Sequence, residues 1–215
     1  MIDLTAIDIL IEPDAIALER AAAENRRLRA QTPEGFSLDA GHRPHITVLQ
    51  RYVRTAELHA MLATVEQVIR SHDLGEASFR ATAIRNMPVA AMPGIGLAAI
   101  VVTPSPGVLK LQQLLIEAIS PFTAPGGTPT AFETTLQEPE INADTLAYVE
   151  HYVPDHSGPN FVAHITVGLA TLAFLDTIEA EDFDSFTFHP SAIAVFKLGN
   201  NGTARKQLKA WPVSE

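Results

Sequence analysis

The tetrapeptide His45-Ile46-Thr47-Val48 returns 119 positions later in the chain as His164-Ile165-Thr166-Val167. Each copy lies in a segment that predicts a β-strand, residues 45–52 and residues 161–169, because β-branched and apolar residues dominate there. Side chains alternate between the faces of a strand, so the His and Thr of each copy share one face and the Ile and Val share the other. The Ile/Val face suits a hydrophobic core, whereas the opposite face presents an imidazole beside a hydroxyl.

The segments around these copies predict an α+β fold. Further strands are expected at residues 5–11, 77–87, 96–103, 192–198 and 205–211, and the last two form a hairpin around the Asn-Gly turn signal at 199–202. Helices are expected at residues 15–31, 55–72, 104–119 and 172–179, with Thr55 as an N-cap. This order contains hairpins and is not a regular βαβ series.

Two segments between the copies give weaker signals. Residues 121–139 contain several prolines and a Gly-Gly pair, which predict an irregular loop that serves as a lid or as a linker. Residues 143–153 are ambiguous, and a turn is expected at residues 154–159.

Composition excludes several classes of protein. The chain has 215 residues, 47% of them apolar, which is too many for a disordered chain and enough for one core, so residues 1–215 are expected to form a single domain. The absence of cysteine excludes disulfides, thiolate metal sites and a cysteine nucleophile. A net charge of −10 argues against DNA or long RNA as a partner, but it permits a small phosphorylated ligand. The acidic N-terminus is unlike a signal peptide, so a soluble, cytoplasmic protein without a membrane partner is expected.

Two imidazoles on opposite sides of one phosphorus could hydrolyse a phosphodiester by in-line attack. One histidine would take a proton from the attacking water and the other would protonate the leaving oxygen, because either role suits the pKa of an imidazole. The two threonine hydroxyls could donate hydrogen bonds to the non-bridging oxygens as their negative charge grows. This scheme requires neither a metal nor another cofactor.

The paired His-x-Thr-x segments resemble those of the two-histidine (2H) phosphoesterase superfamily, in particular the bacterial 2′-5′ RNA ligase-like branch, which includes RNA 2′,3′-cyclic phosphodiesterases. The similarity includes the early strand TAIDILI, Arg43-Pro44 before the first copy, and the closing hairpin. The resemblance implies a bilobal fold of two related halves, each with an antiparallel sheet and flanking helices, around a central cleft. It also implies His45 and His164 as acid and base, and Thr47 and Thr166 as phosphate binders.

This resemblance predicts a metal-independent phosphodiesterase that acts on a 2′,3′-cyclic or 2′-5′ phosphodiester of an RNA end or of a small nucleotide. The stretch between the two copies is longer than in compact members, with the excess around residues 121–159, so the substrate stays open. A monomer is the default oligomeric state. The alternative is a non-catalytic binder that holds a phosphorylated nucleotide in the same cleft.

Basic residues near the two copies could attract a phosphate, although solvated surface charge is the simpler interpretation of each. Arg51 is the first choice, because it follows His45 by six residues and would share the His/Thr face of an unbroken strand. The other basic residues considered are Arg43, Arg54, Arg205 and Lys206. Tyr52, Tyr152 and Phe161 could stack on a base at the rim of the cleft.

A zinc site built from His42, His151 and His156 is a weaker alternative, since no zinc-binding spacing is present. Either His of the repeated segments, taken alone, could also be a hydrogen-bonded core histidine. The pairing of the two copies favours catalysis.

Overall fold

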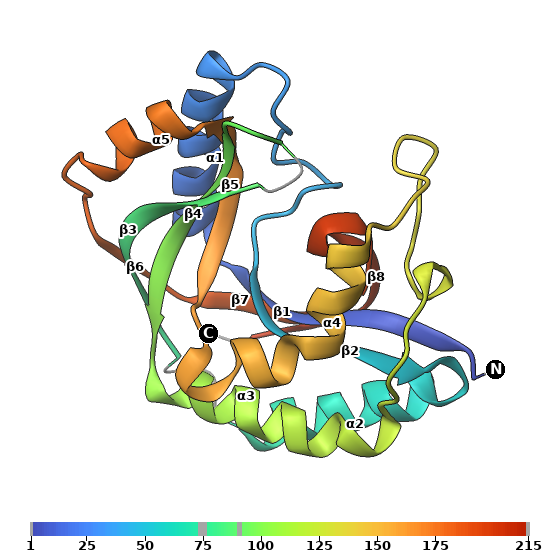
Figure 1. The fold of residues 1–215 in the computed structure, drawn as a ribbon. Helices are drawn as coiled ribbons and strands as arrows, with labels where there is room; N and C mark the ends of the chain where they lie inside the picture. Colours follow the sequence, from blue (N-terminus) through green and yellow to red (C-terminus); the bar gives the residue numbers. More distant parts are fainter. Residues whose placement is uncertain (1, 73–76, 90–91, 214–215) are drawn as a thin grey trace.

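The computed structural model describes residues 2–72, 77–89 and 92–213. The strands are β1 (Leu4–Pro13), β2 (Ile46–Arg54), β3 (Phe79–Pro88), β4 (Ile95–Pro104), β5 (His164–Thr171), β6 (Phe186–Phe188), β7 (Pro190–Leu198) and β8 (Ala204–Pro212). The α-helices are α1 (Ala15–Gln31), α2 (Leu58–Ser71), α3 (Pro106–Ile119), α4 (Ala143–His156) and α5 (Leu172–Glu179). Figure 1 shows how these elements are arranged.

The strands form two antiparallel four-stranded sheets, which confirms the predicted α+β fold with two halves. Sheet A has the order β2-β1-β7-β8, and sheet B has the order β5-β4-β3-β6. The two strands that carry the repeated segment, β2 and β5, are therefore edge strands of different sheets. They contact each other where the two sheets meet.

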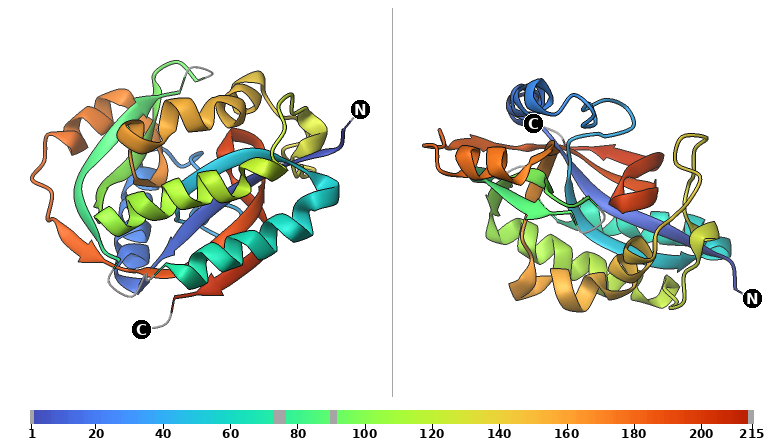
Figure 2. Two further views of the ribbon diagram at one scale, coloured as in Figure 1. Left: turned by 90° about the horizontal axis from the view of Figure 1, so that it is seen from below. Right: turned by 45° about the horizontal axis from the view of Figure 1, so that its top comes forward.

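The main hydrophobic core joins the two sheets. Side chains of sheet A such as Ile9 and side chains of sheet B such as Ile100 belong to the same buried cluster and have no solvent exposure. Helices α2 and α3 pack against each other beneath sheet A, as the view from below shows (Figure 2). Helix α1 follows β1 in the chain but packs on β5 of the other sheet. This helix therefore connects the two halves of the fold.

Most of the predicted elements are confirmed, with small shifts at their ends. The expected N-cap at Thr55 is wrong, because β2 continues to Arg54 and a short 3-10 turn precedes α2; the Thr55 hydroxyl instead lies 2.9 Å from that of Thr5. The ambiguous segment is helix α4, which runs through Pro154 to His156. The turn expected at residues 154–159 thus begins late, since a proline in the last turn of a helix removes only one of its hydrogen bonds.

The closing hairpin turns where the Asn-Gly signal predicts. Asn201 and Gly202 both have positive φ angles, 55° and 72°, which are the backbone conformations that favour these two residue types. Strand β6 is too short to have been predicted. In the described part of the chain, every helix is too short or too polar to pass through a lipid bilayer.

Residues 121–139 contain only short 3-10 turns and irregular backbone, as predicted. The segment is attached to sheet A by a bridge between Thr123 and Val53 and by the packing of Phe132 against Tyr52. Gly127 lies directly on the ring of Tyr52, and a Cβ added there would come within 2.1 Å of that ring.

We expect Gly127→Ala to lower the free energy of unfolding by about 1–3 kcal/mol, because the buried Tyr52 ring cannot move away from an added methyl group. Gly107→Ala in helix α3 is the matched control, since its Cβ would meet only ordinary contacts, with Ser105 and His72. The control should be neutral or slightly more stable. Urea denaturation of both variants tests this, and equal stabilities would show that the segment does not pack closely on Tyr52.

Candidate active site

The two copies of the repeated segment have the same backbone irregularity. In β2, Thr47 pairs with Leu10 and Leu49 pairs with Ile9, so Val48 is an extra residue in the strand. In β5, Thr166 and Gly168 pair with consecutive residues of β4, so Val167 is the extra residue. Each copy therefore ends in a β-bulge at its valine, a feature that often re-aims side chains beside active sites.

A buried side-chain amide satisfies the backbone carbonyl of each bulge. The Gln112 amide of α3 donates to the Val48 carbonyl at 2.9 Å, and the Asn25 amide of α1 donates to the Val167 carbonyl at 2.8 Å. Both amide side chains are almost completely buried. A bulged carbonyl without a partner would be costly in the core, so these two amides hold the two strands in the geometry that the site needs.

The two histidines are oriented by equivalent hydrogen bonds. Nδ1 of His45 lies 2.6 Å from the carbonyl oxygen of Arg43, and Nδ1 of His164 lies 2.8 Å from the carbonyl oxygen of Val162. A carbonyl oxygen only accepts, so Nδ1 carries the proton in both rings. In each ring, Nε2 is then the nitrogen that can take up or release a proton.

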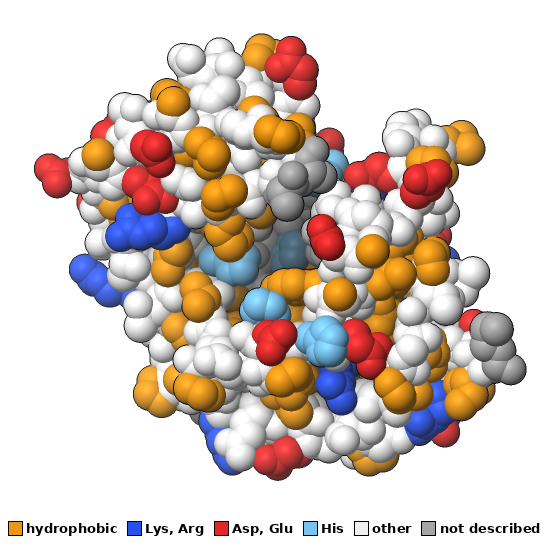
Figure 3. Space-filling view, in the orientation of Figure 1, with side chains coloured by type: hydrophobic (Ala, Val, Ile, Leu, Met, Phe, Trp, Pro, Cys, Tyr) orange, Lys and Arg blue, Asp and Glu red, His pale blue; other side chains and the backbone are white. Residues whose placement is uncertain are grey.

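The alternation of side chains predicted from the sequence is confirmed. Ile46, Val48, Ile165 and Val167 have no solvent exposure and belong to the main core. The histidines and threonines lie on the opposite faces and are half-buried. Figure 3 shows histidine side chains gathered in and around a hollow in this face of the molecule, and this hollow is the candidate cleft.

The environment of the two rings favours the neutral imidazole. Burial lowers the pKa of His45, with the Arg43 carbonyl and Glu12 opposing the shift. Burial also lowers the pKa of His164, and a positive charge on His45 lowers it further. The charge of His45 therefore reaches the His164 ring.

Asp8 is a site residue that the sequence analysis did not identify. It lies in the middle of β1 with no solvent exposure, and its Oδ2 accepts a hydrogen bond from the Thr47 hydroxyl at 3.0 Å. The same oxygen lies 3.6 Å from Nε2 of His45. Burial raises the pKa of Asp8 to about 7 despite its hydrogen bonds from Thr47 and Gln50. The signal in the sequence was an acid inside the apolar run TAIDILI.

Helix α4 supplies an aromatic wall on the same side of sheet A. Tyr148 stacks on His156 with ring centroids 4.5 Å apart, and Tyr152 lies edge-on to Tyr148 at 5.8 Å. The Tyr152 hydroxyl donates to the carbonyl of Thr47 at 3.4 Å. Because Tyr152 and Tyr52 are only 2% and 3% exposed, neither can stack on a base, and Tyr148, at 39%, is the exposed ring of this wall.

The expectation that Arg51 shares the His/Thr face is wrong. The bulge at Val48 shifts the alternation by one residue, so Gln50 pairs with Asp8 and Arg51 pairs with Ile7, whose side chain lies in the core on the other face. Gln50 donates to Asp8 at 3.4 Å, whereas Arg51 donates to the Thr123 hydroxyl at 3.4 Å. Burial lowers the pKa of Arg51, opposed by Glu150.

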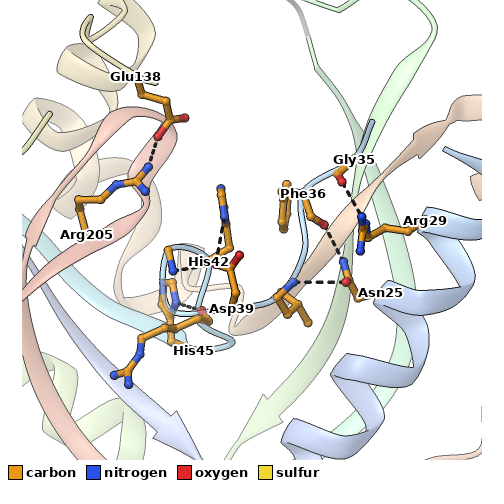
Figure 4. A network of polar contacts seen from close by, with 12 residues as sticks. Asn25, Arg29, Gly35, Phe36, Asp39, His42, His45, Glu138 and Arg205 are labelled. Carbon is orange, nitrogen blue, oxygen red and sulfur yellow. Dashed lines mark hydrogen bonds and ion pairs between the residues drawn. The ribbon is translucent and has the colours of Figure 1, made fainter. Parts of the chain in front are cut away.

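Three other basic residues considered from the sequence form ion pairs with glutamates. Arg43 pairs with Glu12 at 3.0 Å. Arg54 pairs with Glu57, and Arg205 pairs with Glu138. Figure 4 shows the Arg205–Glu138 pair on one side and the segment between α1 and β2 on the other, where Asn25 contacts Phe36 and Asp39 contacts His42 near His45. These three arginines are therefore already paired with acidic side chains.

The residues of the alternative zinc site do not converge. His42 stacks on Phe36 at 4.5 Å, His156 stacks on Tyr148, and His151 is exposed on α4. Within residues 2–72, 77–89 and 92–213, His, Asp and Glu side chains form no group of three or more that could hold a metal ion.

No protein-family model matches the chain, and no curated protein sequence matches it. Among solved structures, a phosphoesterase is similar over 99% of this chain and 100% of its own, with 15% identity and a TM-score of 0.47. E. coli LigT complexed with 3′-AMP is similar over 97% and 98%, with 14% identity and a TM-score of 0.44. Usb1 of Kluyveromyces marxianus is similar over 97% of both chains, with 10% identity and a TM-score of 0.45.

We expect Gln112→Leu to destabilise the fold by about 1–3 kcal/mol for the buried group left unsatisfied. The buried group is the Val48 carbonyl, whereas the Gly158 amide, which donates to Gln112 at 2.9 Å, belongs to an exposed residue and can bond water instead. Gln113→Leu is the matched control, because this neighbouring glutamine is exposed and bonds the exposed side chains of Glu117 and Lys110. Chemical denaturation measures both, and an equal loss in the two variants would contradict the role of Gln112.

The buried carboxyl of Asp8 makes stability depend on pH. Its pKa rises from 3.8 to about 7 on folding, so the folded state holds a proton that the unfolded chain releases. The contribution of Asp8 is therefore favourable at low pH and is lost as the pH rises toward 7. Relative to Asp8→Asn, the wild type should lose up to about 1.4 kcal/mol per pH unit across that window. Unfolding curves at a series of pH values test this, and a constant difference would contradict it.

Proposed function

We propose that this chain is a 2H phosphoesterase that hydrolyses phosphodiesters without a metal. The observation that carries the proposal is the equivalence of the two copies: each lies on an edge strand, ends in a bulge held by a buried amide, and orients its histidine through the same Nδ1 contact. This repeated tertiary geometry is stronger evidence for a shared function of the two segments than the repeated tetrapeptide sequence alone.

The two histidines would divide the proton transfers of one in-line displacement. A neutral imidazole removes a proton from the attacking water while the O–P bond forms. A protonated imidazole donates its proton to the leaving oxygen while the other P–O bond breaks. Burial lowers the pKa values of His45 and His164, which favours the neutral form required of a base near pH 7.

The threonines would bind the phosphate, with Thr47 exchanging its hydrogen bond to Asp8 for one to a non-bridging oxygen. Thr47 and Thr166 lie two residues after His45 and His164 on the same strand faces, so each hydroxyl is beside the imidazole that would flank the phosphorus. A hydroxyl or backbone N–H aimed at the non-bridging oxygens stabilises the charge that develops in the transition state. Arg51 has no part in this scheme, because it lies on the other face of β2.

The charge of the chain favours a small substrate. The net charge is −10, and three of the arginines considered near the site are paired with glutamates, so extended contact with a nucleic-acid backbone is disfavoured. We therefore propose a 2′,3′-cyclic or 2′-5′ phosphodiester at an RNA end or in a small nucleotide. We also propose that residues 1–215 form one domain, because the main core joins both sheets. A cytoplasmic location and a monomeric state stay predictions.

We expect His45→Ala and His164→Ala each to lower kcat on 2′,3′-cyclic nucleotides by about 10²–10⁴-fold, because each removes one proton-transfer group. His151→Ala is the control: this histidine is exposed on α4, and its loss should leave kcat unchanged. Turnover is measured by chromatography of the products, with and without a chelator.

Three results would contradict the proposal. Full activity in folded His45→Ala and His164→Ala proteins would exclude their catalytic role. Loss of wild-type activity in the chelator would indicate a metalloenzyme. Binding of the cyclic nucleotide by calorimetry without turnover would favour the non-catalytic binder.

A further inference from the structure

The burial of the Asp8 carboxyl is energetically costly. Its carboxyl is completely buried in the central part of β1, where Oδ2 accepts from Thr47 and Gln50 and Oδ1 is without a donor among the described residues. A buried carboxylate is costly when its oxygens are not fully hydrogen-bonded. A shared proton would reduce this cost by keeping the site close to neutral.

The partner for such a proton is His45. Oδ2 of Asp8 lies 3.6 Å from Nε2 of His45, whereas Nδ1 of that ring is bonded to the Arg43 carbonyl. The carboxyl therefore approaches the nitrogen that exchanges protons. A carboxylate that only orients a catalytic imidazole binds the opposite nitrogen, Nδ1.

We propose that Asp8 is a positioning residue that shares one proton with Nε2 of His45, and that this makes His45 the proton donor and His164 the proton acceptor in phosphodiester cleavage. This inference rests on the proposed function, which left the roles of the two histidines open.

The electrostatics of the pair agree with this assignment. Burial raises the pKa of Asp8 to about 7 and lowers that of His45, so burial disfavours a charge on either group and favours one proton held by the two together. Movement of that proton between them leaves the net charge of the buried pair unchanged. Two groups coupled in this way release protons in steps that belong to the pair.

His164 has a different environment. Its pKa is lowered by burial and by a positive charge on His45, and it is raised only by the Val162 carbonyl. A carboxylate is not among these influences. Burial is the largest of these influences, and it keeps His164 in the neutral state that is required of a base.

The other groups that face Asp8 do not replace this partner. Tyr148 and Tyr152 of α4 feel the charge of Asp8, which contributes to raising their pKa values far above 7, so both stay neutral near that pH. Glu12, two alternations along β1, pairs with Arg43. Opposite Asp8 on β7 is Phe196, which has no charge.

The proton transfers balance over one cleavage. His164 Nε2 takes a proton from water as the new O–P bond forms, and His45 Nε2 gives its proton to the leaving oxygen as the old P–O bond breaks. The pair is then unprotonated and His164 is protonated. Exchange with solvent restores the starting state, and no other reactant is needed.

Proton NMR of the His45 Cε1–H tests the pair without any substrate. In the wild-type protein, this resonance should show a titration step at about pH 7 or above, when the pair loses its last proton. In Asp8→Asn that step should be absent, and a single step should occur below the ordinary value of about 6.5 for histidine. Asp144→Asn is the matched control, an exposed Asp on α4 whose removal should leave the wild-type curve unchanged.

A second measurement needs no variant. The ¹³Cγ resonance of Asp8 in the wild-type protein should show a step at the same pH as His45 Cε1–H, because one proton is shared. Steps at unrelated pH values, or superimposable His45 curves for wild type and a folded Asp8→Asn, would overturn the proposal.

The pH dependence of kcat/KM gives the functional test. Loss of the pair's proton inactivates the donor, so the alkaline limb should move to lower pH by about one unit or more in Asp8→Asn, with about tenfold lower activity on that limb. The acid limb, which reports His164, should stay in place. An unmoved alkaline limb would overturn the assignment of His45 as donor. If the wild type has no activity, the proposed function fails, and the NMR titration still decides whether the pair exists.

Discussion

The buried Ile and Val side chains of the two repeated segments determine the geometry on which the site depends. Ile46, Val48, Ile165 and Val167 enter one core from two different sheets. Because strand side chains alternate, this burial forces the histidines and threonines of both strands to the other face. The same packing that stabilises the fold therefore keeps both imidazoles out of the core, and the charge of His45 reaches His164. The buried amides of Asn25 and Gln112 hold the bulges that complete this arrangement.

Burial shifts the pKa values of the site residues, whereas the arginines considered near the site are paired with glutamates or lie on another face. Arg43, Arg54 and Arg205 are each paired with a glutamate, and Arg51 lies on the far face of β2. Two half-buried imidazoles and the buried carboxyl of Asp8 can also respond to an anion. Their protonation is sensitive to small changes in local charge, because burial has already moved the pKa values of all three.

Much of the fold could be predicted from local pattern. The α+β order, helices α1 and α5, the Asn-Gly hairpin and the irregular segment at residues 121–139 all agree with the structure. The errors occurred where contacts between residues far apart in the sequence determine the bounds or the existence of an element. Thr55 does not cap α2, because β2 continues past the expected end of the strand. Strand β6 exists only because three residues pair with the edge of β3.

The sequence alone determined that two strands each present a histidine and a threonine on one face, because alternation depends only on the order of neighbouring residues. Tertiary structure decided which other side chains join them. One extra residue at Val48 exchanges Arg51 for Gln50 on the site face, and the pairing of β1 with β2 places Asp8 under His45. Bulges and buried acids depend on strand register and on desolvation. Both are properties of segments far apart in the chain, so a local pattern can mark an acid within an apolar run but cannot assign its partners.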